Sequence, residues 1–187
     1  MNQILDTIHR DHRNYSILLS MLNTDIDNLQ KGERADFIKL YDIMNYMTNY
    51  PDVKHHPTEE IIFDLLETKD PAVKEGVVQL TQEHRQLADT GLRLLEKLHT
   101  VISGGIVSKE SITQAAKDYH ELLRNHLNFE EGKLLPVVKE AFSEEDWEQV
   151  ATKLSQDKDP LFGDAIEEQF TNLFQRISSY KNSNVRH

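Results

Sequence analysis

Apolar residues recur at alternating intervals of three and four along most of this 187-residue chain. This spacing places them on one face of an α-helix, so it restricts the possible folds more than any other feature. Four such stretches cover residues 3–29, 34–67, 72–102 and 109–139, and glycine or proline marks the breaks between them. No run of alternating β-branched residues indicates a strand. The pattern predicts an all-α, up-down-up-down four-helix bundle whose second helix bends near Pro51 or Pro57.

Two additional helices are expected in the C-terminal part, between Ser143 and Tyr180. Ser143 precedes three acidic residues, which is typical of a helix start. A further apolar stripe follows, formed by Ile166, Phe170, Leu173 and Ile177. We expect residues 1–140 to form the bundle and residues 141–187 to form a helical extension packed on it; these helices could instead make a homodimer contact.

Charge and composition exclude several classes of function. Acidic residues outnumber basic ones by 32 to 21, which gives a formal net charge of -11 and argues against binding to nucleic acid. The absence of cysteine excludes disulfides, thiolate metal sites and a cysteine nucleophile. No apolar run is long enough to span a membrane and the first ten residues lack a secretory signal, so we expect a cytoplasmic protein. Motifs for zinc proteases, nucleotide cradles and serine hydrolases are missing.

Histidine interrupts all four apolar stripes, at positions where leucine would be expected. These four residues are His12, His55, His84 and His126. Glu59 and Glu130 each follow one of them by four residues, and residues four apart lie side by side on a helix, about 6 Å from each other. Counted from the predicted turns near Gly32, Asp70 and Gly104, the histidines fall at similar heights along the bundle. The pattern predicts one polar layer inside the core.

Such a layer indicates a metal site. A buried carboxylate without a partner is very costly, and a multivalent cation compensates for it. Imidazole and carboxylate donors without sulfur suit iron, manganese, zinc or nickel. Six donors exceed the need of one closed tetrahedral zinc, so a pair of metals bridged by carboxylates, with an open position for a small ligand such as O₂ or NO, uses them better.

An adjacent pair, His56 and Glu60, also has the spacing of four and competes with His55 and Glu59. His55 and Glu59 are favoured, because their face of the helix continues into the apolar residues Ile62 and Leu66. His56 is left open as an additional ligand.

The remaining candidates are expected to be peripheral. Four histidines fall off the stripes and are expected to face solvent: His9, His99, His120 and His187. Glu60 and Glu131 are interpreted as supporting or surface acids. Tyr15 and Tyr119 lie near the proposed layer and are expected to pack in the core; donation to bound oxygen, or iron ligation, is the alternative.

Four short motifs together resemble the hemerythrin-like (HHE cation-binding) family over about residues 1–140. They are Ile8 to Arg13, His55 to Phe63, Glu83 to Arg85 and Arg124 to Glu131. Residues 157–163 also resemble a tail found in one bacterial branch of that family. The resemblance implies a carboxylate-bridged, non-haem di-iron centre in a four-helix bundle. Matched by motif, the implied ligands are His12, His55, Glu59, His84, His126 and Glu130.

One departure from the family pattern bears on function. Respiratory hemerythrins have a second histidine on the third helix, where this chain has Leu80 or Ala88. His56 is the candidate replacement, because some family members use a ligand directly after the first histidine of this motif. The departure weakens a simple oxygen-carrier role. Binding or sensing of O₂, or of a related diatomic or peroxide ligand, is therefore expected, with peroxide or NO handling and iron storage as alternatives.

Overall fold

The structure, a computed structural model, describes residues 2–154 and 158–184, and within these ranges every regular element is helical. The α-helices are α1 (Gln3–Gln30), α2 (Phe37–Met47), α3 (His56–Lys69), α4 (Lys74–Ile102), α5 (Lys109–Phe129), α6 (Leu135–Ala141), α7 (Glu144–Lys153) and α8 (Thr171–Asn184). Short 3₁₀ turns at Pro71–Val73 and Glu168–Phe170 precede α4 and α8.

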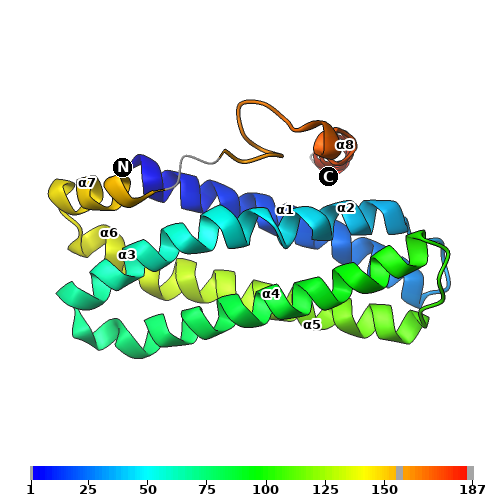
Figure 1. Ribbon diagram of the computed structural model, residues 1–187, viewed down its shortest axis with the longest axis horizontal. Helices are drawn as coiled ribbons and strands as arrows, with labels where there is room; N and C mark the ends of the chain where they lie inside the picture. Colours follow the sequence, from blue (N-terminus) through cyan, green and yellow to red (C-terminus); the bar gives the residue numbers. More distant parts are fainter. Residues whose placement is uncertain (1, 155–157, 185–187) are drawn as a thin grey trace.

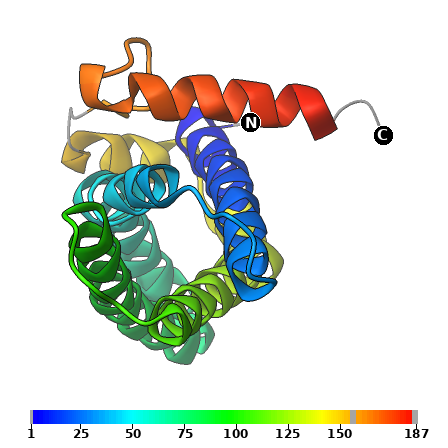
Figure 2. The ribbon, with the colours of Figure 1, turned by 90° about the vertical axis from the view of Figure 1, so that its right-hand side faces the viewer.

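The long segments lie side by side along the long axis of the molecule. Figure 1 shows α1, α2 with α3, α4, and α5 with α6 running lengthwise. Helix α4 packs against both α2 and α5, and α1 packs against α5. Seen from the end in Figure 2, α8 crosses the outside of this bundle, where it contacts α1 and α2. No helix in the described ranges is long and apolar enough to cross a membrane.

Two helices are interrupted by π turns. The first interruption lies where the sequence predicted a bend, near Pro51 or Pro57, and the second was not predicted. The second predicted helix, residues 34–67, is α2 and α3 separated by a π segment at Pro51–His55; it begins at Phe37, after the Asp36 cap, and ends at Lys69. The fourth, residues 109–139, is α5 and α6 separated by a π segment at Glu130–Leu134.

Proline explains both interruptions. Pro57 and Pro136 each lie two residues beyond a π segment. A proline ring has no N–H to donate and clashes with the carbonyl four residues earlier. In each π segment the following residue donates to a carbonyl five residues back: His56 to Pro51, and Leu135 to Glu130. The wider turn relieves the clash, and such turns are frequent at functional sites.

The core consists of two apolar clusters with a polar layer between them. One cluster contains Leu5, Ile8, Ile62, Leu80 and Leu134 among others. The other contains Leu19, Met44, Leu94, Tyr119 and Leu123 among others. Along α1 and α4 the buried residues change from one cluster to the other at His12 and His84, and along α5 the change follows Leu127, the residue after His126.

The C-terminal helices differ in one detail from expectation. Helix α7 begins as predicted, because the Ser143 side chain and the Asp146 side chain each accept from the other residue's backbone N–H. Phe170, Leu173 and Ile177 are buried against the bundle. Ile166 precedes α8 and remains 37% exposed, so its assignment to the apolar stripe of that helix was wrong.

The crossing of α4 with α2 and α5 depends on Gly91. A Cβ atom at Gly91 would lie 2.8 Å from Cγ2 of Thr48 and 3.1 Å from Cε2 of Tyr119. Thr48 cannot easily rotate away, because its hydroxyl donates to the Met44 carbonyl.

We expect Gly91→Ala to lower the free energy of unfolding by about 1–3 kcal/mol. A Cβ at exposed Gly132 meets no atom within 4 Å, so Gly132→Ala is the control and should leave stability unchanged or slightly higher. Equal urea midpoints for the two variants would contradict this account.

Candidate metal centre

Seven buried side chains meet in the polar layer between the two apolar clusters. They come from α1, from the first π segment and α3, from α4, and from the end of α5 with the second π segment. All are 6% exposed or less: His12, His55, His56, Glu59, His84, His126 and Glu130. The structure thus brings together every residue that the sequence singled out as a candidate ligand, including His56.

Three donor atoms form a first group that could hold a metal ion. Nε2 of His12 lies 3.0 Å from Nε2 of His55 and 3.1 Å from Oε1 of Glu59. Nε2 of His55 lies 3.2 Å from the same glutamate oxygen. Two imidazole nitrogens and a carboxylate oxygen therefore point at one another from α1, the first π segment and α3.

A second group lies directly beside the first and shares one residue with it. It consists of His56, Glu59, His84 and His126, whose donor atoms lie within 4.8 Å of one another. The rings of His56 and His84 stack with centroids 4.1 Å apart. Glu59 directs Oε1 to the first group and Oε2 toward Nε2 of His84, 3.6 Å away. This carboxylate is therefore positioned to bridge two ions.

Glu130 also reaches both groups. Its Oε2 atom lies 3.4 Å from Nε2 of His12 and 3.3 Å from Nε2 of His126. Its Oε1 atom lies 3.9 Å from Nε2 of His84. Two carboxylates, on α3 and at the end of α5, thus face each other across the space between the two groups of histidines.

Several atoms at this centre have no hydrogen-bond partner within the described residues. They are Oε2 of Glu59, both carboxylate oxygens of Glu130, and Nε2 of His84 and of His126. The two glutamates are fully buried, and a buried polar atom that makes no hydrogen bond is costly. A metal cation accepts lone pairs from all of these atoms, so the residues present fit one.

Carboxylates also surround the centre on its outer side. Most of the five histidines offer Nε2 to the interior and hydrogen-bond through Nδ1 to a carboxylate. The pairs are His12 with Glu131 (2.8 Å), His56 with Asp52 (3.0 Å) and His126 with Glu83 (3.0 Å), while Nδ1 of His55 lies 3.4 Å from Asp11. For His84 the nearest such oxygen, on Glu60, is 3.7 Å away. A proton held on Nδ1 leaves the Nε2 lone pair free for a metal and fixes the orientation of the ring.

The buried carboxylates change the pKa values of the neighbouring histidines. Burial lowers the pKa of His12, but hydrogen bonds to Glu131 and Glu59 outweigh burial and raise it to about 10. The same balance raises the pKa of His84 to about 10 and that of His55 to about 9. His56 faces three other histidines, and burial holds its pKa well below the usual range. Protons on imidazole thus balance the glutamates, a role that a cation can take over.

The sequence prediction missed several residues on the outer side of the centre. His9 was expected to face solvent, but it is half-buried and its Nδ1 bonds to the Glu131 oxygen that also pairs with His12. Asp11, Asp52 and Glu83 were not singled out. Asp52 precedes His56 by four residues, a spacing that would have revealed it.

The structure also places the remaining histidines and Glu60. His99 is exposed, as expected, and its ring lies 5.9 Å from that of Tyr41. His120 is half-buried rather than solvent-facing. Glu60 is exposed near His84. His187 and Asp157 lie outside the described residues.

A very small cavity adjoins the ligand cluster. Its volume is about 10 Å³, which is enough for about one water molecule. His55, His56 and His126 form one wall, and the remaining lining is largely apolar: Tyr15, Met47, Leu87, Tyr119, Leu123 and Leu127 among others.

Comparison with known proteins agrees with this geometry. The model of the hemerythrin HHE cation binding domain matches residues 3–138. The chain belongs to the hemerythrin HHE family. A search of the curated proteins returns no match. The matched range contains all seven residues of the polar layer, so the cation-binding domain of this family and the cluster between the two apolar cores occupy the same part of the chain.

Two adjacent glutamates, Glu59 and Glu60, test whether Glu59 is a ligand common to both donor groups. Glu59→Gln removes the charge that both donor groups use, so we expect the purified variant to lose most of its bound metal. Glu60→Gln alters a half-exposed carboxylate next to it and should retain the wild-type content. Metal analysis after exhaustive desalting gives the answer, and equal metal content in the two variants would contradict the assignment.

Proposed function

We propose that this hemerythrin-family chain binds two non-haem iron ions and engages O₂ or a related small ligand. The observation that supports this most directly is the double use of Glu59, which belongs to both donor groups. The proposed ligands are His12, His55, His56, Glu59, His84, His126 and Glu130. Nitrogen and oxygen donors without sulfur are compatible with iron, and the domain that matches this chain is a cation binding domain.

The number of donors leaves room for an exogenous ligand. The five histidines and two glutamates offer nine donor atoms, counting both oxygens of each carboxylate. Two six-coordinate ions have about twelve positions. A small molecule can therefore complete the coordination without displacing a protein ligand.

The adjoining cavity supports a ligand of diatomic size. A space of about 10 Å³ excludes anything larger than a few atoms. Apolar and aromatic side chains line it on the side away from the histidines, so bulk water is kept away from the centre. When bound, iron would supply the electrons for O₂ chemistry. The chain's own residues bind the ions, orient most of the imidazoles through an outer carboxylate, and exclude solvent.

We also propose the arrangement of the chain around this centre. Residues 1–140 would form an up-down-up-down four-helix bundle that holds the ions, and residues 141–187 a helical extension packed on it. In support, α7 contacts α3, and α8 contacts α1 and α2.

An oxygen titration tests the function directly. The protein is loaded with ferrous iron under anaerobic conditions, and O₂ is then added while the visible spectrum is followed. We expect about two irons per chain and a new absorption band that grows with O₂. Two bound irons with no spectral change would show that the metal is structural and would contradict the proposal.

His126 is expected to be essential for both metal binding and stability. His126→Ala removes a ligand and leaves Glu130 buried without its nearest partner on α5. We expect loss of iron and a decrease of about 3–5 kcal/mol in the free energy of unfolding of the metal-free protein. His120→Ala is the control, because it changes a half-buried histidine two turns earlier on the same helix and should alter neither property by much. Similar iron content in both variants would count against the site.

A further inference from the structure

Three tyrosines connect the candidate metal centre with the molecular surface. The ring of Tyr15 meets His55 edge-on, with centroids 4.9 Å apart. Tyr46 lies 6.4 Å from Tyr15, and Tyr50 stacks on Tyr46 at 5.6 Å. Tyr15 and Tyr46 are fully buried, and Tyr50 is 7% exposed. The three aromatic rings thus form a continuous line that begins at a proposed ligand.

Tyr46, the middle residue of this line, has an unusual partner. Its hydroxyl donates to Oδ2 of Asp159, 3.1 Å away, and this carboxylate is buried as well. The other oxygen, Oδ1, accepts from the backbone N–H groups of Leu161 and Phe162. One carboxylate oxygen is therefore committed to the loop and the other to the phenol.

The surroundings of Tyr46 and Asp159 favour loss of the Tyr46 hydroxyl proton only when the phenol is oxidised at the same time. Burial raises the pKa of Tyr46, and the charge of nearby Asp159 raises it further, so the phenol does not ionise by itself. Burial also raises the pKa of Asp159, which makes its carboxylate a better proton acceptor. The rings of Phe162 and Phe170 enclose Tyr46 on further sides, each at 5.7 Å.

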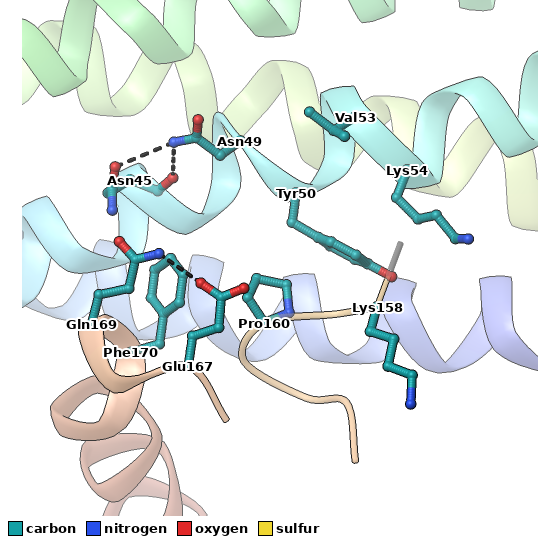
Figure 3. A pocket seen from close by; sticks show the side chains of 10 residues that line it. All are labelled: Asn45, Asn49, Tyr50, Val53, Lys54, Lys158, Pro160, Glu167, Gln169 and Phe170. Carbon is teal, nitrogen blue, oxygen red and sulfur yellow. Dashed lines mark hydrogen bonds between the residues drawn. The ribbon is translucent and has the colours of Figure 1, made fainter. Parts of the chain in front are cut away.

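The outer end of the line opens into a surface cleft. This cleft has a volume of about 490 Å³ and lies between the α2–α3 junction and the segment that precedes α8. Figure 3 shows the Tyr50 ring in its wall, with Asn45 and Asn49 at one end and Lys158 at the other. The size suits a small organic molecule.

We propose that Tyr46 is a redox-active tyrosine that carries single electrons between the metal centre and a small one-electron reductant in this cleft. The proposal rests on the proposed function, because the oxidant is the metal centre after its reaction with O₂. Full reduction of O₂ to water takes four electrons and two ferrous ions supply two on becoming ferric, so oxidising equivalents remain for tyrosine.

The electron and proton balance is simple. Tyr46 gives one electron, through Tyr15, to the oxidised centre, which is thereby reduced by one electron. The O–H bond of Tyr46 breaks and its proton passes to the Asp159 carboxylate, so a neutral phenoxyl radical and a neutral carboxylic acid remain. A reductant such as ascorbate then returns one electron through Tyr50, and Asp159 returns the proton.

The test uses freeze-quenched electron paramagnetic resonance. Iron-loaded, reduced protein is mixed with O₂-saturated buffer, and protein made with ring-deuterated tyrosine shows whether a radical belongs to tyrosine. We expect a tyrosyl signal in the wild type, most of which is lost in Tyr46→Phe. Tyr41→Phe is the matched control, because Tyr41 lies on the same helix outside the line, and it should retain the signal.

A second variant separates redox chemistry from packing. Asp159→Asn can still accept from the loop N–H groups, but it presents an amide donor to the Tyr46 hydroxyl, so the proton acceptor is lost. We expect a much weaker radical signal, with the melting temperature reporting any loss of fold. A purely structural role for the pair predicts the wild-type signal in every variant that folds, and this result would overturn the proposal.

A metal-free experiment distinguishes failure of the proposed electron transfer through Tyr46 from failure of the proposed function. A photogenerated ruthenium(III) complex in solution replaces the centre as oxidant and should also place the radical on Tyr46. If the chain binds no iron but forms this radical, the proposed function is wrong and the assignment of Tyr46 as redox-active stands. If iron binds and reacts but no radical forms on Tyr46 in either experiment, the route is wrong and the proposed function stands.

Discussion

The structure depends on two carboxylates, Glu59 and Glu130, that are buried completely between two apolar clusters. A carboxylate in such a place must be compensated by positive charge or by hydrogen bonds. Five imidazoles surround the pair, and most of these imidazoles are supported from outside by a further carboxylate. The negative charge of these carboxylates is balanced only if protons or metal ions occupy the middle of the layer.

The two π segments determine how the layer is built. His55 ends the first segment and Glu130 begins the second, so each motif of histidine and glutamate borders a break in its helix. His55 and His56 are adjacent in sequence, yet they serve different donor groups, because the first faces α1 and the second faces α4 and α5. The broken helix allows neighbouring residues to contribute to both groups, and Glu59 on the following turn joins them.

Much of this could be predicted from the sequence, for identifiable reasons. The interval of three and four fixed the helical faces, and the interruption of each face by His12, His55, His84 or His126 indicated a shared polar layer. The bend of the second helix near Pro51 or Pro57 was predicted, but the π form of this break and the break before Pro136 were not. A proline limits local hydrogen bonding and does not specify how the chain responds. Some outer carboxylates were missed because they come from another helix than the histidine they support. Glu83, for example, precedes His84 but pairs with His126 on α5.

The central claim is that two metal ions share Glu59. Anomalous diffraction from crystals of the iron-loaded protein, measured at the iron absorption edge, tests it most directly. We expect two separate peaks, one among His12, His55 and Glu59 and the other among His56, Glu59, His84 and His126. A single peak, or peaks away from Glu59, would contradict this account.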